Sequence, residues 1–482
     1  MDRREFLKKS LGCVATVVVG TVIPGLRVDA ATASVQSLTI HITDALKDMC
    51  THNAVNTAQC HFWIYKVKAG NTDIPAECPG PTIVTTSGDL VTLSITNDLD
   101  EPHAFFIPGV FDSGIIAPGK TLVKSFRPTT TGAHLYHDNL NAPVNRVMGL
   151  HGAFIVMPRT RVGRHNFTPY SAPTPNVQKL YDDFGSSEHF PGLAWEEGDS
   201  TPWARDPSVV NCPPFRQYVW LTHQASPNLF AEVAGLPAGQ LYSAQDFLNA
   251  FLRDPFSPIK DNRVPQYFTI NGQSGFFSHF NPTITPMGRI GEPIVIHLMN
   301  AGLWSHSMHL HANHMFITSV NGVVQEDPIW VDVFTLNPMD RVDYTVPFMR
   351  QPDIGTPRGI GRPDTPLVAL DGVPVYPPVE EFEVFMPALG TKAMDAQGND
   401  VELGQRMSPL CYPMHDHSEP SQTSQGGNYN MGLISGIYFI GDRNTPGYMD
   451  YQMDPDFQMA CQNIRGASGV APAAPAIGGS KI

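Results

Sequence analysis

The chain has 482 residues, of which only 16% are charged, together with 44 prolines and 41 glycines. This length is enough for two or three domains, and the composition is typical of a loop-rich β protein rather than a helical one. The formal net charge of −14 argues against nucleic acid or an anionic membrane surface as a partner.

The N-terminus is predicted to be an export signal. Arg3-Arg4 precedes an apolar run that ends near Leu26, and small residues follow up to Ala31, in a pattern similar to a twin-arginine signal. We therefore expect residues 1–31 to be cleaved and the mature chain to reach the periplasm or the exterior, with no membrane attachment. An uncleaved anchor is the alternative, which the glycines and the proline in the apolar run disfavour.

Short alternating runs bounded by turns predict two series of strands, and hence an all-β fold of two Greek-key sandwiches. The expected units are a first domain over residues 34–160, a linker over 161–212, a second domain over 213–442 with an insertion near 350–408, and a partly disordered tail over 443–482. A helix is expected only near residues 243–252. Six cysteines follow the signal and favour some disulfides, whose pairing the sequence does not give.

Two histidine pairs in the second series predict a metal site. They are His309-Leu310-His311 and His415-Asp416-His417. Side chains alternate faces along a strand, so each pair directs two imidazoles to one side, and two such strands side by side can bring four nitrogens together. Imidazole suits copper, zinc, iron and nickel.

Several long phrases resemble the multicopper oxidases, a family of cupredoxin-like proteins that includes laccases and is related to copper nitrite reductases. The most specific are "LYHDNLNAPVNRVMGLHGAFIV", "HLMNAGLWSHSMHLHANHMFI" and "YPMHDHSEPSQTSQGGNYNMGL". The resemblance runs from about residue 34 to 441. It implies four ligand motifs, which build one blue (type 1) copper and one trinuclear copper cluster in the family.

Five histidines match the cluster positions of that family, namely His137, His309, His311, His415 and His417. His306 matches a blue-copper position. Asn139 stands where the family has another cluster histidine. The first motif aligns with residues 106–109, which contain no histidine, and His103 nearby is a further candidate ligand.

The blue copper is not expected in this chain. Asp416 replaces the cysteine that binds it, and Asn428 and Leu433 stand where its histidine and axial methionine would be. A blue site needs a thiolate and two imidazoles. Two readings of Asp416 stay open: a buried hydrogen bond to His306, or a hard ligand for iron or manganese.

The expected function is therefore that of an exported copper-binding oxidoreductase with one or two coppers and no type 1 copper. Its partners would be a small-molecule substrate or dioxygen, and two-domain relatives suggest a homotrimer. Asp416 and Asn139 are the candidates for orienting imidazoles or moving protons in catalysis. The alternative is a non-catalytic cupredoxin protein that stores copper or keeps a metal-free relic of the site.

Overall fold

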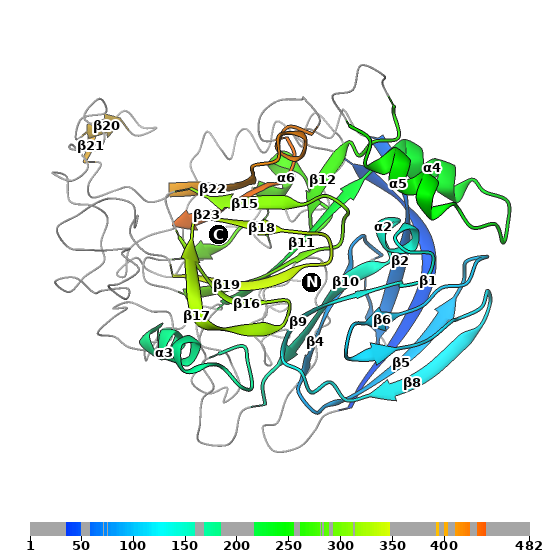
Figure 1. Cartoon of the computed structure of the whole chain (residues 1–482), viewed down its shortest axis with the longest axis horizontal. Helices are drawn as coiled ribbons and strands as arrows, with labels where there is room; N and C mark the ends of the chain where they lie inside the picture. The colour runs from blue at the N-terminus through cyan, green and yellow to red at the C-terminus, as the bar shows by residue number, and fades with distance from the viewer. Residues whose placement is uncertain are drawn as a thin grey trace.

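Two β-sandwiches make up the described part of the computed structural model (Figure 1). The described residues are 35–49, 58–70, 72–74, 76–159, 168–184, 216–254, 261–279, 281, 284–288, 293–311, 314–347, 392–394, 400–402, 410–424 and 431–439. The predicted signal and tail, and most of the predicted linker and insertion, lie outside them. The all-β prediction is confirmed.

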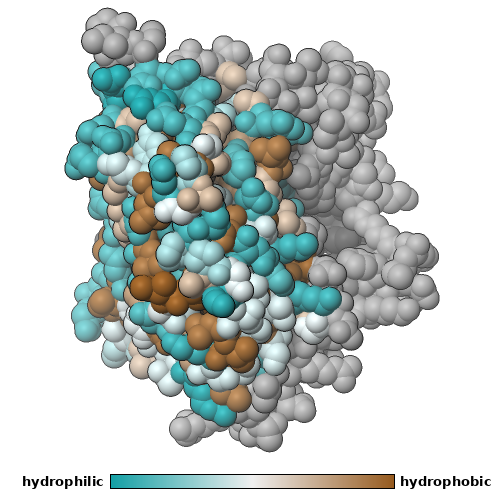
Figure 2. Space-filling view, turned by 90° about the vertical axis from the view of Figure 1, so that its right-hand side faces the viewer, coloured by the Kyte–Doolittle hydropathy of each residue, from teal (hydrophilic) through white to brown (hydrophobic). Residues whose placement is uncertain are grey.

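The first sandwich has two five-stranded sheets, ordered β3-β2-β1-β5-β8 and β4-β10-β9-β6-β7. Its strands are β1 (Val35–Met49), β2 (Ala58–Ala69), β3 (Thr72–Asp73), β4 (Gly80–Thr86), β5 (Leu90–Asn97), β6 (Phe106–Ile107), β7 (Phe111–Asp112), β8 (Thr121–Phe126), β9 (Gly132–His137) and β10 (His151–Met157). Strand β5 alternates half-buried and buried residues along its length, as expected for a strand with one face on the core. Figure 2, which faces this side of the molecule, shows hydrophobic residues interspersed with hydrophilic ones.

The second sandwich pairs a six-stranded sheet, β12-β11-β14-β19-β16-β17, with a five-stranded one, β13-β23-β22-β15-β18. Its strands are β11 (Arg216–Ala225), β12 (Tyr267–Ile270), β13 (Met287–Gly288), β14 (Pro293–Asn300), β15 (His306–Leu310), β16 (Met315–Val320), β17 (Val323–Val331), β18 (Val333–Leu336), β19 (Arg341–Pro347), β22 (Leu410–Asp416) and β23 (Ile434–Phe439). A separate hairpin, β20 (Lys392–Met394) and β21 (Asp400–Glu402), lies in the predicted insertion.

Short helices join and cover the sheets. They are α2 (Val144–Val147), α3 (Pro175–Phe184), α4 (Pro227–Ala234), α5 (Ala244–Phe251), α6 (Gly275–His279) and α8 (Glu419–Gln422). Helix α5 matches the one helix expected from the sequence and begins after Ser243, whose side chain accepts a hydrogen bond from the Asp246 N–H. Helix α3 lies inside the predicted linker. Among the described residues, no helix has the length and apolar character needed to cross a membrane.

The two sandwiches share an apolar seam. Side chains of β9 and β10 pack against β11 and the end of β14. Together they form one buried cluster of Ala133, Leu135, Ala153, Ile155, Val219, Leu221, Met299 and Ala301. Polar contacts cross at the edges of the seam. Arg146 donates to the backbone oxygens of Ala301 and Gly302 at 3.0 and 3.2 Å. The seam therefore fixes the two sandwiches relative to each other.

One contact across the seam should make the protein sensitive to acid. Arg341 donates to Nδ1 of His134 at 3.0 Å, and Nε2 of His134 donates to the Thr130 oxygen. Burial, reinforced by the Arg341 charge, lowers the pKa of His134 to about 4. The unfolded chain, with a histidine pKa near 6.5, binds this proton first as the pH falls. We expect this group's contribution, about 3 kcal/mol, to be present above pH 6.5 and lost as the pH falls to about 4.

The measurement is urea unfolding at a series of pH values between 7 and 4. A His134→Gln variant keeps an acceptor for Arg341 and removes the titrating ring, so its free energy of unfolding should depend on pH with a slope lower by about one proton. Equal slopes for the two proteins would contradict the assignment.

Candidate metal centre

Four histidines meet where β15 and β22 lie side by side. The two strands pair antiparallel, with His309 opposite His415. His311 and His417 follow two residues after these, and therefore on the same face. Ring centroids are 4.9 Å apart for His309 and His311, 5.6 Å for His309 and His415, and 4.7 Å for His309 and His417. We call these four residues the four-histidine cluster.

Hydrogen bonds orient the rings of this cluster. Nδ1 of His309 donates to the backbone oxygen of Asp332 at 3.1 Å, so its Nε2 carries the lone pair. Nδ1 of His415 lies 3.0 Å from the backbone oxygen of Asp416 and 2.8 Å from Nε2 of Gln422. The Nε2 atoms of His311 and His415 are 2.8 Å apart. The contacts of Nδ1 of His309 and His415 with backbone carbonyl groups are typical of metal-binding histidines, whereas the Gln422 amide can only donate to Nδ1 of His415.

Two rings of the cluster, those of His311 and His415, have lowered pKa values. Burial, followed by the charges of the neighbouring histidines, lowers the pKa of His311. Burial also lowers the pKa of His415, against the opposing effect of its hydrogen bond to the Asp416 backbone. The lowered pKa values keep the rings of His311 and His415 neutral at pH 7, so these two rings offer lone pairs rather than protons. His417 is exposed, which opens the cluster to solvent.

Asp416 points away from the cluster into the core and is fully buried with His306. Its Oδ2 accepts from Nδ1 of His306 at 2.6 Å, and its Oδ1 accepts from the backbone N–H groups of Ser307 and Ser418 at 2.7 and 3.1 Å. Burial raises the pKa of Asp416, but the His306 hydrogen bond and charge outweigh it, so the net pKa is lowered. Asp416 is thus an ionised hydrogen-bond acceptor.

Both nitrogens of His306 are occupied. Oε1 of Gln224 accepts from the Leu303 N–H, which leaves Nε2 of Gln224 to donate to Nε2 of His306 at 2.6 Å. His306 therefore carries its proton on Nδ1 and donates a hydrogen bond from this N–H to Asp416. Of the two interpretations of Asp416, the geometry matches the buried hydrogen bond to His306.

The remaining sequence candidates lie in the first sandwich. His137 ends β9, opposite His151 in β10, and packs edge to face on Phe106. It takes no part in the ring contacts that join the four histidines. Burial, followed by the charge of Arg146, lowers the pKa of His137 to about 4. Asn139 is exposed.

His103 is buried against Asp138, a residue that sequence reasoning missed. Nδ1 of His103 donates to Oδ2 of Asp138 at 2.7 Å, and Asn145 donates to the same oxygen at 3.1 Å. The signal was present in the sequence, because His137-Asp138 repeats the order of His415-Asp416 at the end of a strand. Each sandwich therefore contains a buried histidine–aspartate pair at this position.

Comparison with known proteins supports the resemblance read from the sequence. The family model described as multicopper oxidase matches residues 65–161. The structure is similar to a blue copper oxidase from Nitrosomonas europaea, with 15% identity and a TM-score of 0.49 over 88% of this chain and 92% of that one. A copper nitrite reductase from the same organism has 14% identity and a TM-score of 0.45 over 87% and 98% of the two chains. No curated protein matches. The family-model match over residues 65–161 confirms the resemblance to the multicopper oxidases.

Proposed function

We propose that the chain is an exported copper-binding oxidoreductase with one or two coppers at the four-histidine cluster and no type 1 copper. The observation that carries this proposal is the convergence of four imidazoles from β15 and β22. Export rests on residues 1–31 and would deliver the protein to the periplasm or the exterior.

The spacing of the cluster fits an ion. Metal–imidazole bonds are about 2.0 Å long, so two ligands at right angles on one ion have nitrogens about 2.9 Å apart. The Nε2 atoms of His311 and His415 are 2.8 Å apart. Imidazole nitrogen is a ligand that copper accepts readily.

The surrounding groups support a catalytic rather than a closed site. The backbone oxygens of Asp332 and Asp416 hold His309 and His415 through their Nδ1 atoms. The exposure of His417 gives a small molecule or dioxygen a route to the ligands. Bound copper would supply the electron transfer, and the protein's part is to hold the imidazoles neutral and in place.

The absence of a type 1 copper is supported by the saturation of Asp416 and His306. Neither side chain has a thiolate, and hydrogen bonds already satisfy both ring nitrogens of His306 and both carboxylate oxygens of Asp416. The usual route of electrons from donor to cluster in laccases is then missing. Substrate would have to meet the cluster directly.

His137 would complete the site from a second copy of the chain. Its neighbours within this chain are Phe106 and His151 of the first sandwich. One buried nitrogen of His137, Nδ1, has no hydrogen-bond partner. A homotrimer in which the first sandwich of one copy meets the second sandwich of the next would bring His137 to the cluster.

A second candidate function is non-catalytic, either copper storage or a relic site. The hydrogen bond between His311 and His415 favours it, because two rings that satisfy each other need no ion. Metal content and turnover separate the two functions.

We expect purified protein to bind about one copper or more per chain beyond what a His309→Ala/His415→Ala variant binds, because that variant has lost two of the four imidazoles. Metal content should be measured by mass spectrometry, and oxygen uptake with phenols should fall with it. A His41→Ala/His61→Ala variant is the matched control, because these histidines lie on β1 and β2. Copper binding that is equal in all three proteins would rule out the cluster, and binding without turnover would favour storage.

A further inference from the structure

A second group of ligand-type side chains lies at the seam between the sandwiches, away from β15 and β22. Cys78 precedes β4, His151 begins β10, and His223 lies in β11. One ligand atom from each lies within 4.8 Å of the other two. The three residues are 4%, 0% and 2% exposed. Among the described residues, this is the group of three His, Cys, Asp or Glu side chains whose ligand atoms all lie within 4.8 Å of one another.

The two imidazoles are already arranged as ligands. Nδ1 of His151 donates to the Arg146 oxygen at 2.8 Å, and its Nε2 is buried without a partner. Nε2 of His223 donates to the Val147 oxygen at 2.8 Å, so the lone pair lies on its Nδ1. The ring centroids are 4.5 Å apart. A buried nitrogen without a partner is costly unless something binds it.

Burial keeps both rings neutral. It lowers the pKa of His223 to about 3, and it lowers the pKa of His151 well below the usual range, with the charge of His223 adding to the effect. At neutral pH each ring therefore carries one proton, and neither is a cation. The two lone pairs therefore remain available to an electron-pair acceptor.

Cys78 supplies a soft third donor. Its thiol has only a long contact, 3.9 Å, to the Gly149 oxygen. Burial raises the pKa of this thiol to about 12, so without an ion it stays protonated. A bound metal ion removes that proton, because a coordinating thiol is deprotonated outright. Each ion that binds would release one proton to solvent and form one metal–sulfur bond.

The charges around the group favour a monovalent ion. Lys47 donates to the Cys78 backbone oxygen at 2.9 Å, and the charges of Lys47 and Arg146 both act on His223. A divalent ion would add a net positive charge beside these cations, whereas a monovalent ion with one thiolate is neutral. Thiolate is also among the ligands that select copper(I).

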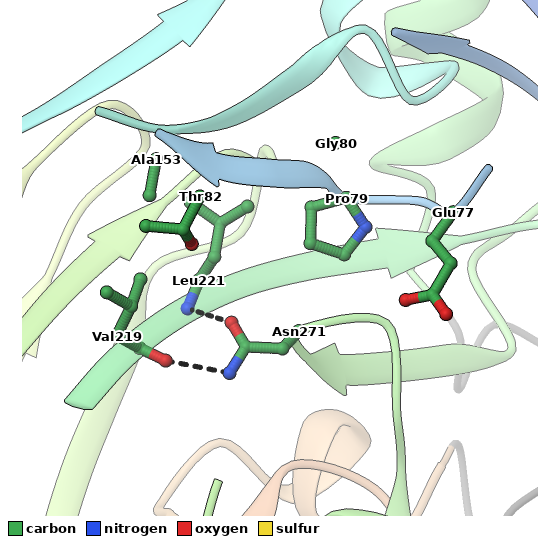
Figure 3. A pocket seen from close by; sticks show the side chains of 8 residues that line it. All are labelled: Glu77, Pro79, Gly80, Thr82, Ala153, Val219, Leu221 and Asn271. Atoms are coloured by element: carbon green, nitrogen blue, oxygen red, sulfur yellow. Dashed lines mark hydrogen bonds between the residues drawn. The ribbon is translucent and has the colours of Figure 1, made fainter. Parts of the chain in front are cut away.

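A small pocket is lined by residues next to Cys78 in the chain and by residues of β11. The pocket in Figure 3 is lined by Glu77 and Pro79, the chain neighbours of Cys78, and by Val219 and Leu221 of β11. Asn271 closes one side through hydrogen bonds to Val219 and Leu221. The Glu77 carboxylate, half-buried at this pocket, would attract a cation.

We propose that Cys78, His151 and His223 form a buried three-coordinate copper(I) site that links the two sandwiches. Cys78 and His151 belong to the first sandwich and His223 to the second, so a shared ion joins them. Because the folded chain assembles the ligands, the binding free energy adds to the stability of the seam. The site is independent of the proposed function of the four-histidine cluster.

The test uses full-length protein carrying His309→Ala/His415→Ala, so that the four-histidine cluster does not contribute. Copper(I) is supplied without oxygen from a chromophoric chelator of known affinity. We expect one copper(I) per chain and a rise in Tm on binding. Cys78→Ser should weaken binding by at least about 100-fold, since it removes a direct ligand rather than its support. Cys60→Ser, which alters the neighbouring buried cysteine, should change it by less than about 3-fold.

A second variant keeps the test decisive if Cys78→Ser does not fold. His223→Gln can still donate to the Val147 oxygen but has lost the ring lone pair, and it should also bind at least about 100-fold more weakly. X-ray absorption at the copper edge should show one sulfur and two nitrogens. Equal affinity in the variants, a Cys60–Cys78 disulfide in the purified protein, or preference for zinc(II) over copper(I) would overturn the proposal.

Discussion

Replacing Asp416 by asparagine is expected to lower the free energy of unfolding by about 3 kcal/mol, because it removes one partner of a fully buried ionic hydrogen bond. The amide of the new side chain can still accept from the Ser307 N–H through its oxygen. Its nitrogen, however, would face Nδ1 of His306, where a donor already lies. Two donors then oppose each other in the core.

His306 cannot relieve this conflict by moving its proton. A proton on Nε2 would face the donating amide of Gln224, whose orientation is fixed by the Leu303 N–H. Either tautomer of His306 therefore leaves one buried donor without an acceptor.

Urea unfolding of metal-free protein, followed by tryptophan fluorescence, measures the effect, which should lower the midpoint by up to about 1 M. The matched control is Asp98→Asn, which alters an exposed histidine–aspartate pair with His41 at 2.7 Å and should cost under about 1 kcal/mol. An equally small loss of stability for Asp416→Asn would contradict the expectation that removing this carboxylate leaves a buried donor unpaired.

The two buried pairs indicate why aspartate is tolerated beside a histidine at the end of a strand in both sandwiches. In each, the carboxylate accepts from a histidine Nδ1 and from a following backbone N–H, Leu140 in the first and Ser418 in the second. These bonds close the turn that leaves the strand. Aspartate at this position therefore has a structural role that does not depend on a metal.

Much of the four-histidine cluster could be predicted from the sequence because it depends on local rules. The alternation of side chains places His309 with His311, and His415 with His417, on one face of their strands. The sequence did not give the pairing of the two strands, but the register of His309 opposite His415 is the one that brings both pairs together. Local pattern and strand pairing agree here.

The group at the seam could not be predicted in the same way. Cys78, His151 and His223 come from segments far apart in the chain, and no motif spacing joins them. Their meeting depends on how the two sandwiches pack. Helix α4 was missed for a different reason: Ser226 caps it and Pro227 begins it, but the short apolar run resembles a buried strand.

Replacing Gly149 by alanine is expected to cost about 4 kcal/mol or more and to displace the group at the seam. Gly149 has φ +124°, a conformation that residues with a side chain rarely adopt, and this alone costs about 1–3 kcal/mol. A Cβ there would also lie 2.5 Å from the Trp63 backbone oxygen and 3.1 Å from Sγ of Cys78. Backbone oxygen cannot rotate away, so the chain itself must shift.

Gly119→Ala separates the two parts of that cost. Gly119 also has positive φ, +67°, but nothing lies within 4 Å of its Cβ position, so only the backbone preference, about 1–2 kcal/mol, should be lost. Urea unfolding should then show a larger loss in the free energy of unfolding for Gly149→Ala than for Gly119→Ala. Because Gly149 lies two residues before His151 and against Cys78, its alanine variant should also bind copper(I) more weakly than Gly119→Ala. Equal losses of stability would mean that the close approach at Gly149 is relieved without cost, and would remove the mechanical link between this turn and the ligands.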